Sequence, residues 1–313
     1  LYFGASRLFK TVDGGDHWQM ISPDLARPDP GIPDSVGERH PPNADKQRGV
    51  IYALGVSAIQ KGLLVVGTDD GQIYKTNDEG GHWANITPPA LTAWSKVTQI
   101  EVSHVDPNVI YASVSRLRVD DLKPYVYKTK DGGAHWQLIV DGLSMPVNAV
   151  REDPIQSNLL YAATERDVMM SLDEGAHWQS LTLNLPHTSM RDVVVKDNDL
   201  VLATHGRSFW VLDDVSRLRQ AARLANASLV SPAKAMRVAR STWSDTPIAR
   251  DEPLGENPPA GAVIDYQLHT KAKEVTIEIK NQQGERVRVF TSHDAQNPSE
   301  EELEHQLIPR WWA

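Results

Sequence analysis

The sequence contains no cysteine, so disulfide bonds and thiolate metal sites are excluded and the redox compartment is left open. No apolar stretch approaches the roughly 20 residues that a membrane-spanning helix requires. Acidic residues outnumber basic ones by 41 to 32, which gives a formal net charge of −9. This balance disfavours nucleic acid and anionic membrane surfaces as partners.

An initiator Met and a signal peptide are also missing. The chain begins with LYFG, a pattern typical of the middle of a strand. We therefore expect the 313 residues to be an internal segment of a longer protein, with its targeting signals elsewhere. This length predicts a sizeable core and two domains.

One octapeptide is written four times, with Ser or Thr first, Asp third, Gly fifth, His seventh and Trp last. The copies are TVDGGDHW (11–18), TNDEGGHW (76–83), TKDGGAHW (129–136) and SLDEGAHW (171–178). The spacing between copies shrinks along the chain while the template stays fixed. This pattern indicates a repeated structural unit joined by loops of unequal length.

Each octapeptide lies between runs of β-forming residues. Residues 62–86 contain, in this order, an apolar run, a DDG turn, a second run, the octapeptide and a short third run. A further strand precedes such runs at 52–59, 97–103 and 147–153. Four antiparallel strands per unit, repeated about every 40 to 50 residues, predict the blades of a β-propeller.

We interpret the octapeptide as a structural hairpin clip. The Asp carboxylate accepts backbone hydrogen bonds, the Gly adopts a positive φ, and the Trp is buried between neighbouring sheets. A reaction centre is normally built once, so four copies argue against catalysis. The residues concerned are Asp13, Gly15, Trp18, Asp78, Gly80, Trp83, Asp131, Gly133, Trp136, Asp173, Gly175 and Trp178.

The histidines of the octapeptides, one per blade, are too widely spaced to share a metal ion. They are His17, His82, His135 and His177. The sequence contains no HExxH or comparable cluster. We therefore predict no metal and no cofactor.

The octapeptide resembles the Asp-box, or BNR repeat, of sialidases, xyloglucanases and the sortilin family. The segments 101–139, 150–186 and 199–214 are similar to large bacterial exported proteins of the sortilin-N-terminal-like or glycosyl-hydrolase-like kind. The resemblance covers about residues 1–290. It implies a propeller fold and a secreted, periplasmic or cell-surface location, but no single reaction.

The predicted fold class is all-β. Residues 1–214 should form a partial β-propeller of about five blades, the first and last incomplete, with complete blades at 51–86, 97–139 and 147–181. Residues 215–261 should be a linker with a short helix and a strand. Residues 262–313 begin like an Ig-like or fibronectin-type β module, with three strands where a sandwich has about seven.

Strand order predicts where a binding site would lie. In a four-stranded meander, the second-to-third loops and the blade-to-blade connections share one face, and the octapeptides lie on the other. On the first face we expect a ligand site for a protein, peptide or carbohydrate. Its candidates are Asp69, Asp70, Trp94, Arg116, Arg118, Glu165, His205 and Arg207.

Asp120 and Asp121 are the candidate catalytic residues, because their loop is the longest of its class and carries Arg. A carboxylate pair can cleave a glycosidic bond as acid and base or nucleophile. The alternatives are that VDDL is a turn or cap, that HGRS bonds backbone and that Trp94 is a plug. Neither the Arg cluster and Tyr–Glu pair of sialidases nor the two-propeller cleft of xyloglucanases can be assigned.

Three functional hypotheses follow. The first is a non-catalytic extracytoplasmic binding scaffold, because four structural clips accompany no recognisable catalytic set. The second is a glycoside hydrolase that uses loop carboxylates. The third is an assembly factor of the kind that some Asp-box propellers provide in photosynthetic membranes.

Overall fold

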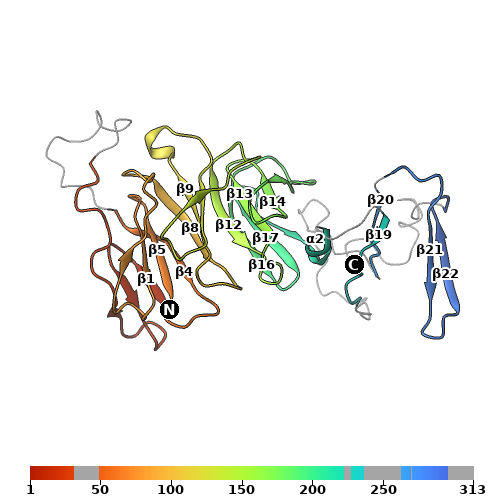
Figure 1. The fold of residues 1–313 in the computed structure, drawn as a ribbon, viewed down its shortest axis with the longest axis horizontal. Coiled ribbons are helices and arrows are strands. Elements are labelled where there is room, and N and C mark those ends of the chain that lie inside the picture. The colour runs from red at the N-terminus through yellow and green to blue at the C-terminus, as the bar shows by residue number, and fades with distance from the viewer. Residues whose placement is uncertain (32–48, 222–226, 236–261, 269, 295–313) are drawn as a thin grey trace, which may run out of the picture. The chain divides into compact units, whose positions relative to one another are not determined.

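The computed structural model describes residues 1–31, 49–221, 227–235, 262–268 and 270–294. The chain divides into two compact units, Leu1–Arg219 and Gln220–Ala313. Within the described residues of the first unit, antiparallel sheets follow one another in chain order (Figure 1). The only helical elements described there are the 3₁₀ turn η1 (Leu117–Val119) and the start of α2 (Ser216–Ala221).

Sheets 1 and 5, at the two ends of the series, each have three strands. Sheet 1 contains β1 (Tyr2–Gly4), β2 (Leu8–Lys10) and β3 (Gln19–Met20), with the first octapeptide between β2 and β3. Sheet 5 contains β16 (Met190–Lys196), β17 (Asp199–Thr204) and β18 (Phe209–Leu212).

Sheets 2, 3 and 4 are complete four-stranded meanders. Sheet 2 contains β4 (Ile51–Val56), β5 (Leu64–Thr68), β6 (Ile73–Thr76) and β7 (Ala84–Asn85). Sheet 3 contains β8 (Lys96–Val102), β9 (Ile110–Ser115), β10 (Val126–Thr129) and β11 (Gln137–Leu138). Sheet 4 contains β12 (Val147–Glu152), β13 (Leu160–Thr164), β14 (Val168–Ser171) and β15 (Gln179–Ser180). The predicted partial propeller of four-stranded antiparallel blades is confirmed.

The hydrophobic core consists of layers between consecutive sheets. Leu8 and Val66 belong to the layer between sheets 1 and 2, and Val65 and Tyr127 to the next layer. The third layer, between sheets 3 and 4, includes Tyr111, and a fourth lies between sheets 4 and 5. We call the side of a sheet that contacts the preceding sheet its leading face, and the other side its trailing face.

The octapeptide turns have the same internal hydrogen bonds in all four copies. In the second copy, the Thr76 hydroxyl donates to Asp78 Oδ1 (2.7 Å) and accepts from the Gly80 N–H (3.0 Å). The His82 backbone N–H donates to Asp78 Oδ1 (2.8 Å), and its ring Nδ1 lies 2.6 Å from Asp78 Oδ2. The bonds from the His82 ring and backbone and from Thr76 lower the pKa of Asp78. The turn is therefore fixed by its own side chains, as predicted for a clip.

The Gly and Trp of three octapeptides also contact the preceding sheet. Indole N–H groups donate to the backbone carbonyls of Ile21, Ile86 and Ile139, from Trp83 (2.9 Å), Trp136 (2.7 Å) and Trp178 (3.0 Å) respectively. The same three Ile residues lie against Gly80, Gly133 and Gly175, where a Cβ atom would approach them to between 2.2 and 2.6 Å. We call this pair of contacts the Gly–Trp clamp.

At two of these junctions, a lysine of the preceding sheet also donates to a side chain of the following octapeptide. Lys10 of sheet 1 donates to Glu79 Oε2 (2.8 Å) in the next octapeptide. Lys128 of sheet 3 likewise donates to Glu174 Oε2 (2.8 Å). At the middle junction, Lys75 donates to the Gly132 carbonyl (3.3 Å). Each of these junctions is thus bonded in both directions.

The junction between sheets 4 and 5 is built differently, because sheet 5 carries no octapeptide. Asp214 Oδ1 accepts from the Ser216 N–H (3.1 Å) at the start of α2 and so acts as a helix cap. Arg219 of this helix donates from Nε to both carboxylate oxygens of Asp153 (2.9 Å each). Its Nη1 also donates to Asn198 Oδ1 (2.6 Å). The Asp153 side chain is fully buried, so a buried ion pair joins these two sheets.

The second unit contains two small antiparallel pairs among its described residues. β19 (Ala227–Leu229) pairs with β20 (Tyr266–Leu268), and β21 (Thr276–Lys280) pairs with β22 (Arg286–Thr291). The three strands expected within 262–290 are present, but β20 pairs with β19 rather than with β21. Most of the predicted linker and the residues after 294 lie outside the described part, and the Ig-like assignment stays a prediction.

Candidate functional site

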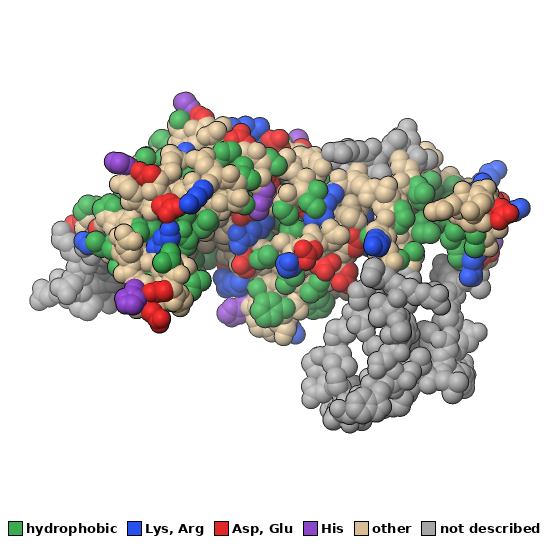
Figure 2. Space-filling model, turned by 90° about the horizontal axis from the view of Figure 1, so that it is seen from below, with side chains coloured by type: hydrophobic (Ala, Val, Ile, Leu, Met, Phe, Trp, Pro, Cys, Tyr) green, Lys and Arg blue, Asp and Glu red, His purple; other side chains and the backbone are tan. Residues whose placement is uncertain are grey.

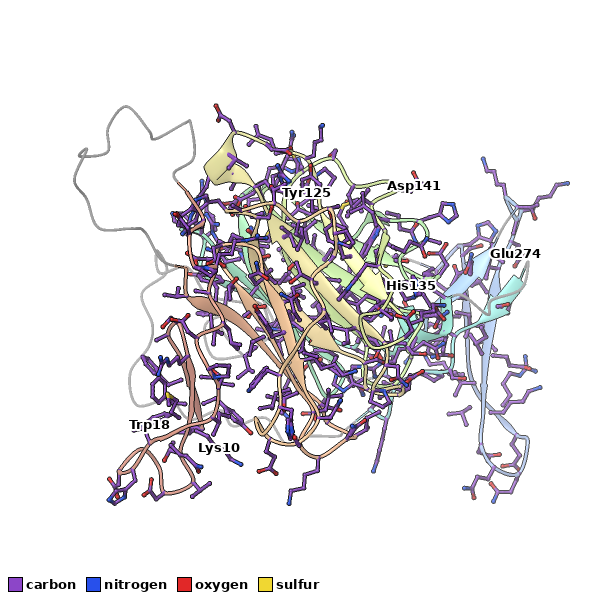
Figure 3. All side chains as sticks on the ribbon, turned by 60° about the vertical axis from the view of Figure 1, so that its left-hand side comes forward. Lys10, Trp18, Tyr125, His135, Asp141 and Glu274 are labelled. Carbon is purple, nitrogen blue, oxygen red and sulfur yellow. The ribbon has the colours of Figure 1, made fainter. Side chains whose placement is uncertain are left out.

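The second-to-third loops and the sheet-to-sheet connections come together, as strand order predicted. Arg118, in the loop after β9, donates from Nη1 to Asp69 Oδ2 (2.7 Å) in the loop after β5. The His205 backbone N–H donates to the Ser189 carbonyl (2.8 Å) and so joins the loop after β17 to a connection. In Figure 3, Tyr125 lies at the upper end of the first unit, whereas Lys10 and Trp18 lie at its lower end. We call this upper side the loop face.

The octapeptides lie on the other side. Figure 2 views the molecule from below and shows His side chains beside acidic ones at separate places. Their Asp–His pairs are exposed to solvent, and they do not gather around a common cavity in the described residues. The clip interpretation and the separation of the two faces therefore agree with the coordinates.

Asp69 and Asp70, both expected to meet a ligand, are buried in the loop face. Asp69 accepts from the Val50 N–H (2.8 Å) in addition to Arg118. Asp70 accepts from the Arg27 N–H (2.8 Å) and from the Thr68 hydroxyl. Both carboxylates thus anchor the connection between sheets 1 and 2, and Asp70 has no solvent-exposed surface from which to contact a ligand.

Trp94 is also buried, with a positive φ of 60°. Its indole N–H donates to the Gly31 carbonyl (2.9 Å), and the Arg118 guanidinium lies 5.7 Å from its ring centre. The side chain fills the space between two connections. This is the plug that the sequence allowed as an alternative to stacking on a sugar.

Asp121 lies in a polar corner with Arg116 and Tyr125. Its Oδ2 accepts from the Tyr125 hydroxyl (2.7 Å) and lies 3.2 Å from Arg116 Nε, while Oδ1 accepts from the Lys123 N–H (3.1 Å). Burial acts to raise the pKa of Asp121. The bonds from Tyr125 and Lys123 and the charge of Arg116 outweigh burial, so the pKa lies below its ordinary value. Asp121 is therefore ionised at neutral pH.

Asp120 is exposed and occupies the end of η1 in the left-handed conformation, with φ of 61°. Its backbone N–H donates to the Leu117 carbonyl (3.2 Å). With Asp121, Leu122, Lys123, Pro124, Leu143 and Ser144 it lines an open hollow of about 610 Å³. Asp120 thus ends a turn and at the same time faces a space that a ligand can enter.

The remaining charged candidates lie near sheets 4 and 5. Glu165 Oε1 accepts from Arg191 Nη1 (3.1 Å), and neighbouring Asp167 Oδ1 lies 2.6 Å from His187 Nδ1. His205 and Arg207 are exposed. The Thr188 hydroxyl and the Trp210 indole bond the backbone carbonyls of these two residues, not their side chains. Their side chains therefore stay available on the loop face.

The structure adds residues that sequence reasoning missed. We call the first strand of each of sheets 2 to 5 its inner strand; these strands are β4, β8, β12 and β16. Each inner strand has a β-bulge near its loop-face end, at an equivalent position. The residues left out of the regular pairing are Tyr52, Thr98, Asn148 and Arg191. A bulge redirects a side chain, and bulges are frequent beside binding and active sites. Tyr52 is exposed and has Lys96 Nζ 3.5 Å from its ring centre, and Arg191 holds Glu165.

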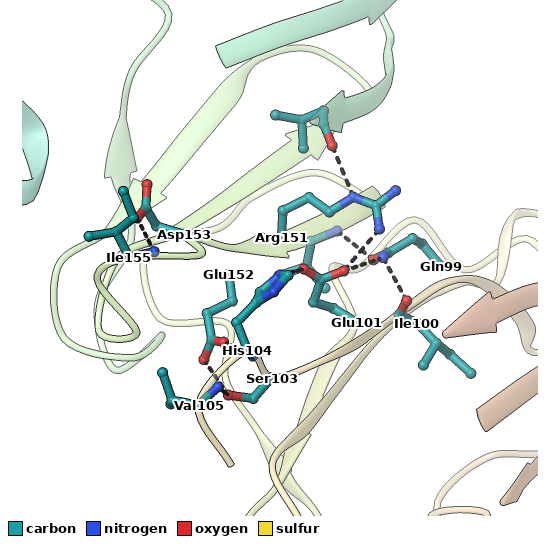
Figure 4. Close-up of polar contacts among 12 residues, drawn as sticks. Gln99, Ile100, Glu101, Ser103, His104, Val105, Arg151, Glu152, Asp153 and Ile155 are labelled. Carbon is teal, nitrogen blue, oxygen red and sulfur yellow. Dashed lines mark hydrogen bonds and ion pairs between the residues drawn. The ribbon is translucent and has the colours of Figure 1, made fainter. Parts of the chain in front are cut away.

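A second polar cluster, also missed, joins the inner strands of three sheets (Figure 4). Arg151 Nη1 donates to Glu101 Oε2 (2.9 Å), and its Nη2 lies 3.3 Å from Asp192 Oδ1. Glu152 accepts from the Ser103 hydroxyl (3.0 Å) and the His104 N–H (2.7 Å). Polar letters inside the runs VTQIEVS and VNAVRED were the signal that could have revealed it. Glu101, Ser103 and Glu152 are buried, which fits a role in joining the sheets.

Two groups in this cluster have raised pKa values. The bond to Glu101, whose Oε1 lies 3.3 Å from His104 Nε2, raises the pKa of His104. Burial raises the pKa of Glu152. Both shifts favour the protonated forms in the folded state.

Among the described residues, no group of three or more His, Asp or Glu side chains is arranged to hold a metal ion. Nor does any helix in that part of the chain have the length and apolar character needed to cross a membrane.

Comparisons with known proteins support the β-propeller fold. No family model matches the chain. A 138-residue segment is 25% identical to xyloglucanase Xgh74A of Acetivibrio thermocellus, covering 42% of this chain and 14% of that enzyme. The GH74 xyloglucanase of Xanthomonas campestris aligns with 68% of this chain and 34% of its own, at 18% identity and a TM-score of 0.50. YCF48 bound to D1 peptide aligns with 52% of this chain at 15% identity and a TM-score of 0.40. The chain thus shares a β-propeller fold with GH74 xyloglucanases and spans a small part of their length.

Proposed function

We propose that the first unit is a non-catalytic binding scaffold that holds a polar ligand, a glycan or a peptide, on its loop face. The observation that carries this proposal is the set of four equivalent bulges near the loop-face ends of the inner strands. Two of the bulged residues, Tyr52 and Arg191, are exposed there. Exposed His205 and Arg207 and the hollow beside Asp120 extend the same surface. The octapeptides fit the Asp-box interpretation, because their side chains are used within the turn and its junction.

The charges of the loop face support binding over acid–base chemistry. Asp69, Asp121 and Glu165 each lie in an ion pair with an arginine. A glycosidase acid needs a raised pKa, so that it carries a proton at working pH. The pKa of Asp121 is lowered, and within the described ranges the carboxyls with raised pKa are Glu152 and Asp213, which are outside this set.

Glycan and peptide arrays probed with the purified chain test the proposal. We expect saturable binding without turnover, weakened at least tenfold by Tyr52→Ala or Arg191→Ala. Ile155→Ala, on an exposed loop away from this face, is the matched control and should bind normally. Hydrolysis of any array glycan, or binding unchanged by both variants, would contradict it.

The likeness to xyloglucanases favours one alternative, a glycoside hydrolase of which this chain forms part. In that case ionised Asp121 would serve as base or nucleophile, and Asp120 would line the substrate hollow. Asp121→Asn and Asp120→Asn should then abolish xyloglucan hydrolysis by the complete enzyme, while circular dichroism shows that the fold is retained. Full activity in both variants would remove these residues from the mechanism.

The proposed location is extracytoplasmic, secreted or at the cell surface. The support is the sequence resemblance to exported bacterial proteins. Fractionation of cells that produce the parent protein tests this proposal, and recovery in the cytoplasm alone would contradict it.

A further inference from the structure

In three ion pairs of the loop face, the arginine is more exposed than its carboxylate partner. The arginine side chains are between 46% and 57% exposed, and the carboxylates are between 12% and 24% exposed. The arginines are Arg118, Arg166 and Arg191, and their respective partners are Asp69, Asp167 and Glu165. In a fourth pair, Arg116 with Asp121, the two side chains are equally exposed. The charge that these pairs present to solvent is therefore mainly positive.

The octapeptide side has the reverse order. Glu79 and Glu174 are 42% and 43% exposed, whereas Lys10 and Lys128, which pair with them, are 24% and 5% exposed. Lys130 adds an exposed cation at Glu174. The four octapeptide aspartates are exposed as well, and their pKa values are lowered, so they are ionised at neutral pH. Exposed carboxylates thus mark the octapeptide side, and exposed cations mark the loop face.

Two cations of the inner strands have donors that no carboxylate occupies. Lys96, at the start of β8, has its Nζ 3.5 Å from the ring centre of Tyr52, and no carboxylate in the described part of the chain pairs with it. Arg191 of β16 donates to Glu165 through Nη1 (3.1 Å), and its Nε and Nη2 make no bond to another described residue. Each cation reaches back to the preceding sheet and keeps donors for a further acceptor.

The exposed carboxylates near these cations do not reverse the sign of the charge. Asp120 lies in the loop 116–123, which carries three basic and two acidic side chains. Asp192, next to Arg191 in β16, has its Oδ1 3.3 Å from Arg151 Nη2 and is therefore already paired. Lys96 and Arg191 remain the inner-strand groups best placed to attract an anion.

We propose that the loop face binds an anionic polysaccharide, a polymer of uronic acids, in which Lys96 and Arg191 each bind a sugar carboxylate. This inference rests on the binding function proposed above and names its class of ligand. Beside Lys96, the Tyr52 residue is 55% exposed. A uronic acid carries its carboxylate on the sugar ring itself, so one sugar contacts Tyr52 with its ring and Lys96 with its charge. An acidic amino-acid side chain has the charge but no comparable flat apolar surface.

The separation of the two cations favours a polymer over a single sugar. Lys96 and Arg191 belong to sheets 3 and 5, and stacked sheets lie about 10 Å apart, so the two sites are separated by roughly 10 to 20 Å. A single sugar contacts one of them. A chain with a carboxylate on every sugar contacts both at once, which raises its affinity.

Calorimetric titration of the purified chain with oligogalacturonate, its methyl ester and polyglutamate tests the proposal. Oligogalacturonate should bind, and the neutral ester should bind more weakly by about tenfold or more. Lys96→Gln and Arg191→Gln should each weaken binding by about three- to tenfold. Lys96→Arg should restore binding, because it keeps a cation beside the Tyr52 ring. Lys61→Gln, which removes the same charge from a 94% exposed side chain near Glu79, is the matched control and should bind like the unchanged chain.

Circular dichroism establishes that each variant is folded. Equal affinity for the acid and the ester, tighter binding of polyglutamate, or an equal loss in Lys61→Gln would overturn the proposal. A neutral glycan that binds through Tyr52 while oligogalacturonate does not would overturn this inference alone and leave the binding scaffold in place. Hydrolysis of oligogalacturonate would contradict the scaffold function but support this class of ligand.

Discussion

The junctions between sheets 1 to 4 and the junction between sheets 4 and 5 hold neighbouring sheets together by different contacts. At the first three, a glycine gives room and an indole N–H binds a backbone carbonyl of the preceding sheet. At the last, Arg219 reaches from α2 to a fully buried carboxylate, Asp153. The clamp uses neutral groups, whereas the ion pair buries two charges.

The difference predicts unequal sensitivity to substitution. A neutral clamp loses one neutral hydrogen bond when it is broken. A broken buried ion pair leaves an uncompensated charge in the interior, which costs far more. The same Asp153 also lies 3.5 Å from the Tyr161 hydroxyl, so its loss affects the layer between sheets 4 and 5.

The largest expected effect is at Arg219. Arg219→Met should lower the free energy of unfolding by about 3–5 kcal/mol, because Asp153 then remains buried without its partner. Urea unfolding followed by circular dichroism measures it. In the double variant Arg219→Met with Asp153→Asn the loss should be much smaller, since both charges are gone. A cost below about 1 kcal/mol for the single variant would show that the ion pair does not hold this junction.

The next effect compares Gly80 with Gly15, the same position of two octapeptides. Gly80→Ala should cost roughly 2–5 kcal/mol, from a φ of 102° and from the new methyl group against the Ile21 carbonyl. Gly15→Ala, with a φ of 116° but open space, should cost about 1–2 kcal/mol. Equal losses in denaturant unfolding would mean that close approach to the preceding sheet is unimportant.

A smaller effect concerns the indole hydrogen bond. Trp83→Phe removes the N–H that binds the Ile21 carbonyl and should cost about 1 kcal/mol beyond the change in ring size. Trp18→Phe is the matched control, because in the described part of the chain its N–H makes no corresponding bond. The difference between the two unfolding midpoints gives the value of the bond. No difference would reduce the clamp to apolar packing.

The smallest effect is a pH dependence at the inner-strand cluster. The pKa of His104 is raised above 6.5, so its contribution to stability is fully present below pH 6.5 and is lost as pH rises through the folded value. The raised pKa of Glu152 acts in the same direction at lower pH. Unfolding measured from pH 6 to pH 8 should therefore show a decline that is smaller in His104→Gln, where the raised pKa of His177 still contributes. Identical profiles for the two proteins would exclude His104 as its source.

Sequence reasoning worked for the features that are fixed locally. The octapeptide places the hydroxyl, carboxylate, glycine and indole within eight residues, so its turn and the strands beside it could be predicted. The blade boundaries followed, because each turn marks the same point of a meander. Strand order then placed the loop face correctly, since it depends only on which strands follow one another.

The rest depends on residues that meet from distant parts of the chain. Asp70 looked like an exposed turn residue, but Arg27 and Val50 arrive from a connection and enclose its loop. The bulges at Tyr52 and Arg191 arise from the register of strand pairing, and no local sequence pattern predicts that register. Arg219 could be placed in a helix, but its partner Asp153 lies 66 residues earlier in the chain.

The Gly–Trp clamp recognises a backbone carbonyl and a nearby aliphatic group, and neither contact requires a particular neighbour. Any sheet that ends in this way can precede any octapeptide, so the clamp gives strength to a junction without deciding which sheets meet. The shape of the apolar layers decides which sheets pack together. At the position of Val65 in sheet 2, sheets 3 and 4 have Tyr111 and Tyr161. Exchanging two sheets should therefore succeed or fail on the fit of these layers, while the clamps re-form in either order.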